Sequence, residues 1–123
     1  MDHVRRNRTI WDAWAPDWLE RGEHAWAKTE PCWGIHQIPE SDVGLLKKFS
    51  QGKVIELGCG TGYVSAWLSR LGGHPIGVDN SLAQLSNAHQ LQDRFDLSFP
   101  LVHADAECLP FIDESFDFAI SEY

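Results

Sequence analysis

The sequence contains few cysteines, and their spacing does not suit a metal or redox site. Cys32, Cys59 and Cys108 lie far apart in the 123 residues, and no C-x-x-C pair occurs. This argues against a zinc knuckle or a thioredoxin-like centre, while free thiols fit a reducing cytosol. The six histidines also lack H-E-x-x-H or any other helical ligand spacing. We therefore predict no metal site.

A long hydrophobic run is missing as well. No apolar segment approaches the roughly 20 residues that cross a bilayer, so we expect no transmembrane span. Residues 1–14 include basic side chains but no apolar stretch of about 7–15 residues behind them, so they do not resemble a secretory signal. We therefore expect a cytoplasmic location. The hydrophobic fraction of 43% is ordinary for a globular protein, and it predicts one domain with a buried core.

Positive charge is scarce in the second half of the chain. Residues 1–70 hold nine basic and nine acidic side chains, whereas residues 71–123 hold one basic and nine acidic, which gives the net charge of −8. Because nucleic acids are bound largely through basic surfaces, this distribution disfavours such a partner. Arg5, Arg6 and Arg8 form a basic cluster, and near a terminus such a cluster is expected to be a solvated tail.

Tryptophan is concentrated in residues 1–38, which hold five of the six in the chain. Trp11, Trp14 and Trp18 fall at i, i+3 and i+7, on one face of a helix. Pro16 is expected to kink or restart that helix. Two interpretations stay open. The stripe faces the core of an accessory helix, or it belongs to a lid whose aromatic rings close over a bound ligand.

From residue 39 onwards, helix and strand patterns alternate along the chain. A short helix is expected after Pro39, with Val43, Leu46 and Phe49 turned inward. Ser81 is expected to begin a later helix as part of a capping box. Strands separated by helices predict a parallel sheet of βαβ units with right-handed crossovers, and hence an α/β fold. The strands are expected at 54–57, 76–78, 100–103 and 116–121, and the helices between the first three at 64–71 and 82–91.

A glycine-rich turn, Gly-Cys-Gly-Thr-Gly at residues 58–62, follows the first of these strands. Glycines let the backbone turn tightly and approach a ligand, and the helix behind the turn offers unpaired amide groups at its positive end. The dinucleotide fingerprint G-x-G-x-x-G requires glycine at position 63, which is Tyr63, and no P-loop lysine follows. The spacing therefore favours S-adenosylmethionine, which has no pyrophosphate, over a nicotinamide dinucleotide.

Two carboxylates follow the next two strands. Asp79 comes 17 residues after Gly62, where a carboxylate can accept hydrogen bonds from both ribose hydroxyls. A turn or N-cap role is the alternative for Asp79, but Ser81 suits the cap better. Asp105 follows the third strand, where its carboxylate can accept a hydrogen bond from an adenine amino group. The backbone N–H of Ala106 is then placed to meet a ring nitrogen.

Four segments occur in a fixed order: VIELGCGTGYVSAWL, GVDNS, HADAECLPF and DESFDFAIS. Together they resemble the class I S-adenosylmethionine-dependent methyltransferases, and among them the small-molecule branch that includes the ubiquinone and menaquinone biosynthesis enzymes. The resemblance covers residues 52–123. It implies an enzyme that uses S-adenosyl-L-methionine to methylate a small-molecule acceptor. From the charge distribution and the lack of a long apolar run, we expect no nucleic acid and no membrane as partner.

The resemblance also implies which residues contact the cofactor. Glu56 would lie near the methionine end, Asp79 would hold the ribose, and Ser121 would lie near the sulfonium. Asn80 stands where many members have an aliphatic residue that packs on adenine. The segment RTIWDAWAPDWLERG resembles the N-terminal lid helix of such enzymes, with Trp18 where the family often has tyrosine. The implied cofactor-binding residues are Trp18, Glu56, Gly58, Cys59, Gly60, Gly62, Asp79, Asn80, Asp105, Ala106 and Ser121.

The family fold is a seven-stranded sheet in the order 3-2-1-4-5-7-6, so the resemblance implies that this chain supplies strands 1 to 4 of an incomplete Rossmann-like sheet. Residues 1–38 would be a helical lid or accessory segment. Residues 39–123 would be the N-terminal part of the cofactor-binding domain, truncated after strand 4. That strand, with Phe116, Phe118 and Ile120, would then be an apolar edge open to self-association, unless residues 1–38 cover the bare face of the sheet.

The reacting groups stay unassigned. His36 and His103 are candidates for a general base, but a structural or exposed role is favoured for each, so we name no catalytic residue. Two alternative functions stay open beside methyl transfer. One is an NAD(P)-type nucleotide-binding oxidoreductase domain, and the other is an inactive fragment that associates with itself through the fourth strand.

Overall fold

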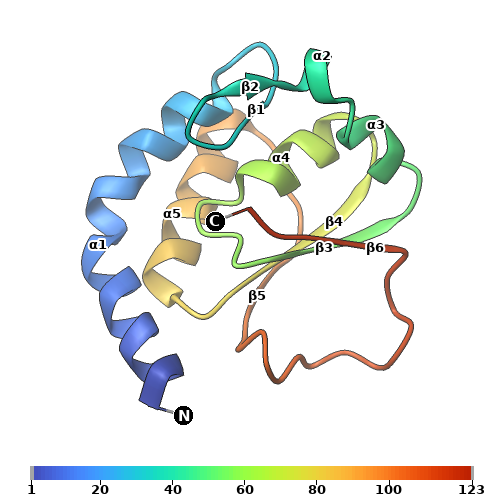
Figure 1. The fold of residues 1–123 in the computed structure, drawn as a ribbon. Coiled ribbons are helices and arrows are strands. Elements are labelled where there is room, and N and C mark those ends of the chain that lie inside the picture. The colour runs from blue at the N-terminus through green and yellow to red at the C-terminus, as the bar shows by residue number, and fades with distance from the viewer. Residues whose placement is uncertain (1, 123) are drawn as a thin grey trace.

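Four parallel strands form the centre of the structure, a computed structural model that describes residues 2–122. They lie in the order β5-β4-β3-β6, which confirms the predicted order 3-2-1-4 (Figure 1). Every neighbouring pair in this sheet is parallel. The bounds of the strands are β3 Lys53–Leu57, β4 His74–Asp79, β5 Leu101–His103 and β6 Phe118–Ile120.

The two crossover helices, α4 (Tyr63–Arg70) and α5 (Leu82–Phe95), pack on one face of the sheet. The steps from β3 to β4 and from β4 to β5 run in the same direction, so right-handed crossovers place both helices on the same side. Val54 of β3 packs there against Val64 and Leu68 of α4. The segment between β5 and β6 runs on the other side of the strands (Figure 1).

The N-terminal helix α1 (Asp2–Trp26) packs against α5 and α4, and Trp33 joins the cluster around Val54 and Leu68. Residues 1–38, as far as they are described, therefore lie on the face that the helices already cover. The alternative that they cover the opposite face is wrong. The reason is the approach of α1 to α5: its buried residues are Ala15, Gly22 and Trp26, and the first two are small enough for close contact.

The tryptophan stripe of α1 does not face the core, so that interpretation is also wrong. Trp11 and Trp14 are 38% and 52% exposed, and the rings of Trp11 and Trp18 meet edge to face with centroids 5.7 Å apart. The helix continues through Pro16 for 25 residues rather than restarting. The tryptophans point away from the core because a different face of α1, with Ala15 and Gly22, makes the close contact with α5.

The segment between α1 and β3 differs from the single helix that the sequence predicts. A two-stranded antiparallel hairpin comes first, formed by β1 (Cys32–Trp33) and β2 (Ile38–Pro39). Two one-turn helices follow, α2 (Glu40–Val43) and α3 (Leu46–Phe49). Gly44, with φ 71°, separates them, and the Glu40 carboxylate accepts the N–H groups of Leu45 and Leu46 at 2.6 and 2.8 Å. Leu46 is buried as predicted, whereas Val43 is exposed.

The strand β6 lies at the edge of the sheet, as predicted, but it is shorter than residues 116–121. The ring of Phe118 packs edge to face on Phe49, with centroids 5.1 Å apart. Phe116 lies outside the strand and packs on Phe111 at 5.0 Å. The apolar side chains of this edge are thus half-buried by contacts within the chain.

Candidate cofactor-binding site

A cavity of about 540 Å³ lies where the strands of the sheet end, with α1 forming one wall. It brings together residues from the glycine-rich turn, from the loops after β4, β5 and β6, and from α1. Ten of the eleven residues implied to contact the cofactor line this cavity, and Gly62 is the exception. The ten are Trp18, Glu56, Gly58, Cys59, Gly60, Asp79, Asn80, Asp105, Ala106 and Ser121.

The glycine-rich turn has a left-handed backbone at each of its glycines. Gly60 lines the cavity with φ 52°, a conformation that favours glycine. Gly62, with φ 80°, begins α4, and a Cβ atom there would lie 3.1 Å from the ring of Phe99. Gly62 therefore packs on the side of the turn that faces the core, instead of against the cavity where the sequence placed it.

Asp79 connects the glycine-rich turn to the start of α5. Its Oδ2 accepts the N–H of Gly60 at 2.7 Å, and its Oδ1 accepts the N–H of Ser81 at 2.8 Å. Burial raises the pKa of the Asp79 carboxyl, and the two N–H groups act in the opposite direction. Because each carboxylate oxygen can accept more than one hydrogen bond, both oxygens could still accept a hydrogen bond from a hydroxyl group of a ligand bound in the cavity.

The cap of α5 is shared in a way that the sequence did not predict. The Ser81 hydroxyl accepts the N–H of Gln84 at 3.1 Å, which confirms Ser81 as the N-cap. The side chain of Gln84 does not complete the capping box, since it accepts from Asn87. Instead, the Asp79 carboxylate accepts the N–H of Ser81. Asp79 therefore both stabilises the turn before α5 and lines the cavity.

Glu56 is a buried carboxyl in the lining of the cavity, only 3% exposed. Its Oε1 accepts the N–H and the hydroxyl of Ser65 at 2.9 and 2.7 Å, and neither bond uses Oε2. Burial raises the pKa of Glu56 to about 7, and the charges of Glu122 and Asp79 add to this. A cation placed in the cavity would therefore favour the ionised carboxylate.

Tyr63 was read from the sequence only as a missing glycine, yet it shapes the cavity. Its hydroxyl accepts the N–H of Cys32 at 2.6 Å and donates to the carbonyl of Cys32 at 3.1 Å. This holds the hairpin against α4, and both residues line the cavity. Burial raises the pKa of Tyr63 to about 12 and that of the Cys59 thiol further above its usual value, so both groups are neutral wall atoms near pH 7.

The remaining predicted residues lie in the loops around the cavity. Ser121 donates its hydroxyl to the carbonyl of Leu57 at 2.9 Å, which ties the end of β6 to the end of β3. The Oδ1 of Asp105 accepts the N–H of Glu107 at 2.9 Å. The side chain of Asn80 is engaged by α1, with its oxygen accepting from Arg8.

Several lining residues were missed by sequence reasoning. Trp11 lines the cavity beside Trp18, and the i, i+7 spacing carried that signal in the lid interpretation. Gly22 approaches the glycine-rich turn so closely that a Cβ atom would lie 2.9 Å from Thr61. Helix periodicity gives no sign of such a long-range contact. Neither His36 nor His103, the candidate bases, is among the residues that line the cavity.

Within residues 2–122, no three His, Cys, Asp or Glu side chains lie close enough together to hold a metal ion. No helix in the described part of the chain is long and apolar enough to cross a membrane.

Residues 54–123 match the methyltransferase domain family over more than half of the chain. The chain belongs to the class I S-adenosylmethionine-dependent methyltransferases. This favours a methyltransferase over the NAD(P)-type oxidoreductase that the sequence left open.

Curated proteins that are named as methyltransferases are similar to this chain. Methyltransferase GfsG of Streptomyces halstedii is 43% identical over a region that covers 53% of this chain and 24% of that protein. Ubiquinone biosynthesis O-methyltransferase of Bartonella tribocorum is 27% identical, with 98% of this chain and 49% of that protein covered. The chain thus spans only part of the curated relatives that it matches, between 12% and 49% of their length.

Solved structures share the fold. One, described as "Conversion of a Disulfide Bond into a Thioacetal Group during Echinomycin Biosynthesis", superposes with a TM-score of 0.68 at 32% identity. The match covers 94% of this chain and 46% of that one. The PH0226 protein from Pyrococcus horikoshii OT3 superposes with a TM-score of 0.59 at 32% identity, over 65% of this chain and 39% of that one.

Proposed function

We propose that the cavity binds S-adenosyl-L-methionine, and that this chain is the cofactor-binding part of an enzyme that methylates a small molecule. The observation that carries the proposal is the position of Asp79. Its carboxylate stands at the end of β4, held by the N–H groups of Gly60 and Ser81, and faces a cavity lined by the glycine-rich turn. A carboxylate so placed suits the two hydroxyls of a ribose.

The other lining residues define the direction of the cofactor. Asp105 and Ala106, after β5, would meet the adenine. Glu56, which is bonded to Ser65 of α4, would face the methionine end, and Ser121 would lie near the sulfonium. The cavity is lined by more carboxylates than cations. Its carboxylates are Glu56, Asp79, Asp105, Glu107 and Glu122, and its Lys and Arg side chains are Arg21 and Lys28. This balance suits a ligand that carries a sulfonium and an ammonium group.

When bound, the cofactor supplies an electrophilic methyl group. The residues of this chain would then act by holding the cofactor in one orientation and excluding water from the sulfonium side. We propose residues 1–38 as the lid and residues 39–123 as the cofactor-binding unit. The small-molecule acceptor is supported by the likeness to a ubiquinone biosynthesis O-methyltransferase and by the scarcity of basic residues after residue 70.

The proposal is tested by calorimetric titration with S-adenosylhomocysteine, the demethylated cofactor. The wild type is expected to bind it and to ignore NADH. Asp79→Asn is expected to weaken binding at least tenfold, or roughly 1.4 kcal/mol. Asp93→Asn, an exposed carboxylate on α5, is the matched control and is expected to bind as the wild type does.

Each result has a separate meaning. Thermal unfolding of both variants shows whether a loss of affinity reflects a loss of fold. A folded wild type that does not bind S-adenosylhomocysteine would overturn the proposed function of this chain. Equal affinity of Asp79→Asn and the wild type would leave cofactor binding intact and overturn the ribose role of Asp79.

A further inference from the structure

The first half of α1, residues 2–14, is held by polar contacts rather than by the core. None of its residues is buried, and only Val4 and Asp12 are even half-buried. The buried residues of α1, which are Ala15, Gly22 and Trp26, all belong to the second half. Whatever keeps the first half against the domain must therefore come from specific side-chain contacts.

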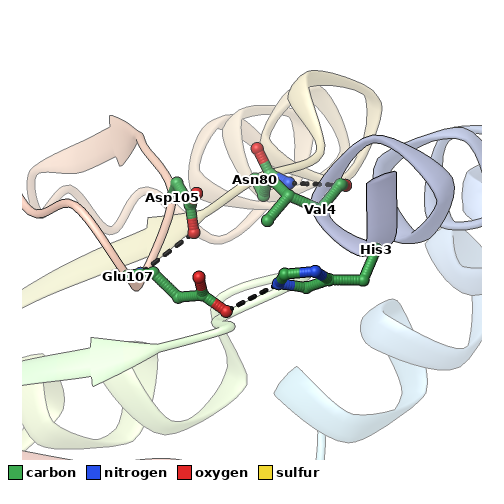
Figure 2. A network of polar contacts seen from close by, with 5 residues as sticks. All are labelled: His3, Val4, Asn80, Asp105 and Glu107. Carbon is green, nitrogen blue, oxygen red and sulfur yellow. Dashed lines mark hydrogen bonds and ion pairs between the residues drawn. The ribbon is translucent and has the colours of Figure 1, made fainter. Parts of the chain in front are cut away.

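Those contacts converge on Asn80, the residue that directly follows Asp79. The Oδ1 of Asn80 accepts two hydrogen bonds from the Arg8 guanidinium, at 3.1 Å from Nε and 2.7 Å from Nη2. Its Nδ2 donates to the carbonyl of Val4 at 3.2 Å (Figure 2). One amide side chain thus holds two successive turns of α1, and it uses both its acceptor and its donor to do so.

Two further contacts join the same half of α1 to the neighbouring loops. The Nε2 of His3 lies 2.8 Å from the Oε1 of Glu107, and the N–H of Glu107 in turn donates to Asp105 (Figure 2). The Ser81 hydroxyl, which caps α5, lies 2.6 Å from Asp12 Oδ1. Three of these anchors, Asn80, Ser81 and Glu107, lie within two residues of Asp79 or Asp105, the carboxylates proposed for ribose and adenine. The Asp12 carboxylate also accepts the N–H of Ala83 at 3.4 Å.

We propose that Asn80 is a positioning residue that holds the first half of α1 over the adenosine end of the cavity, and that cofactor binding and this docking stabilise each other. The proposal rests on the proposed function, because it assumes that adenosine lies on Asp79 and Asp105. An aliphatic residue at position 80 has neither the acceptor nor the donor that Arg8 and Val4 require. By linkage, docking that favours the cofactor must be favoured by it equally.

The test combines hydrogen exchange with calorimetry on the full chain, using S-adenosylhomocysteine as the probe. Asn80→Leu and Arg8→Met are expected to speed amide exchange in residues 6–14 at least fivefold, with α4 and α5 unchanged. Both are expected to weaken binding of the probe at least fivefold. Arg6→Met is the control, because Arg6 is an exposed arginine of the same helix, and it is expected to change neither quantity.

The double variant gives a stricter test of the contact. Because Asn80→Leu already removes the contacts with both Arg8 and Val4, the exchange rate in the double variant is expected to equal that of Asn80→Leu alone. Additive effects would overturn the proposed contact. Addition of S-adenosylhomocysteine to the wild type is expected to slow exchange in residues 6–14.

Failure of this proposal and failure of the proposed function give different results. If Asn80→Leu weakens the probe but leaves exchange in residues 6–14 unchanged, Asn80 acts on the cofactor directly and the positioning role is overturned. If exchange rises but no variant, including the wild type, binds the probe, the proposed function is overturned and the coupling falls with it. In that case the anchoring of α1 by Asn80 still stands, because exchange measures it without a ligand.

Discussion

The buried carboxyl of Glu56 makes stability depend on pH, and the size of the effect can be worked out. Its pKa is about 7 in the folded chain, compared with an ordinary value of 4.5. One pKa unit corresponds to about 1.4 kcal/mol, so the shift is equivalent to about 3 kcal/mol. The folded pKa is the higher one, so the folded state binds more protons. The contribution is therefore complete below about pH 4.5 and is lost as the pH rises through about 7.

The perturbation that isolates this effect is Glu56→Gln, since a glutamine oxygen can still accept both hydrogen bonds from Ser65 but does not titrate. Between pH 5 and pH 8, the free energy of unfolding of the wild type is expected to fall by about 2–3 kcal/mol relative to the variant. Urea unfolding at four pH values in this interval measures the difference. Glu20→Gln, an exposed carboxylate on α1, is the control and should follow the wild type.

Parallel stability curves for the wild type and Glu56→Gln would refute a raised pKa of the buried Glu56 carboxyl. A difference in the opposite direction, with the wild type gaining stability as the pH rises, would refute it as well. A companion measurement concerns the ligand. Because the ammonium group of S-adenosylhomocysteine favours ionised Glu56, the affinity of the wild type is expected to fall below about pH 7, and that of Glu56→Gln to be nearly flat.

Three further predictions concern the packing of the chain. Gly22→Ala puts a methyl group 2.9 Å from Thr61. Because this overpacking outweighs the better helix propensity of alanine, urea unfolding should show that the free energy of unfolding falls by about 1–2 kcal/mol. Arg70→Met removes the hydrogen bond from Nη1 to the Trp26 carbonyl at 2.8 Å. In the same assay the free energy of unfolding is expected to fall by about 1–3 kcal/mol, and an unchanged value would contradict a stabilising role of Arg70. Self-association through β6 stays a prediction: sedimentation velocity should show it rising with concentration, and Ala119→Lys, at the exposed centre of that edge strand, should reduce it.

The sheet could be predicted because its signals are local. Each strand holds a short apolar run, and the helices after Gly62 and Ser81 carry their own periodicity and start signals. The carboxyl ends of parallel strands meet at one edge, so Asp79 and Asp105 had to come together. The chain order of these elements therefore explains why the predicted residues at the ends of β3, β4, β5 and β6 line one cavity, whereas Trp18 on α1 was implied only by the family resemblance.

What could not be predicted depends on contacts between distant residues. The face of α1 that meets α5 is set by the close approach at Gly22, which helix periodicity does not reveal. The anchoring of Arg8 on Asn80 joins residues 72 positions apart. The break at Gly44 depends on Glu40 capping the next helix with its side chain. A hairpin with two-residue strands is too short to leave a periodic pattern, so β1 and β2 were missed.

The most direct test of the central claim is to map the binding of S-adenosylhomocysteine onto the chain by backbone amide chemical shifts. If the cavity at the ends of the strands binds the cofactor, the largest shifts are expected at Gly58, Gly60, Asp79 and Ala106. Residues 92–98, which form the C-terminal end of α5 and the loop after it and line a separate small cavity, serve as the internal reference and should stay unchanged. Shifts confined to 92–98, or none at saturating ligand in a folded chain, would contradict the account.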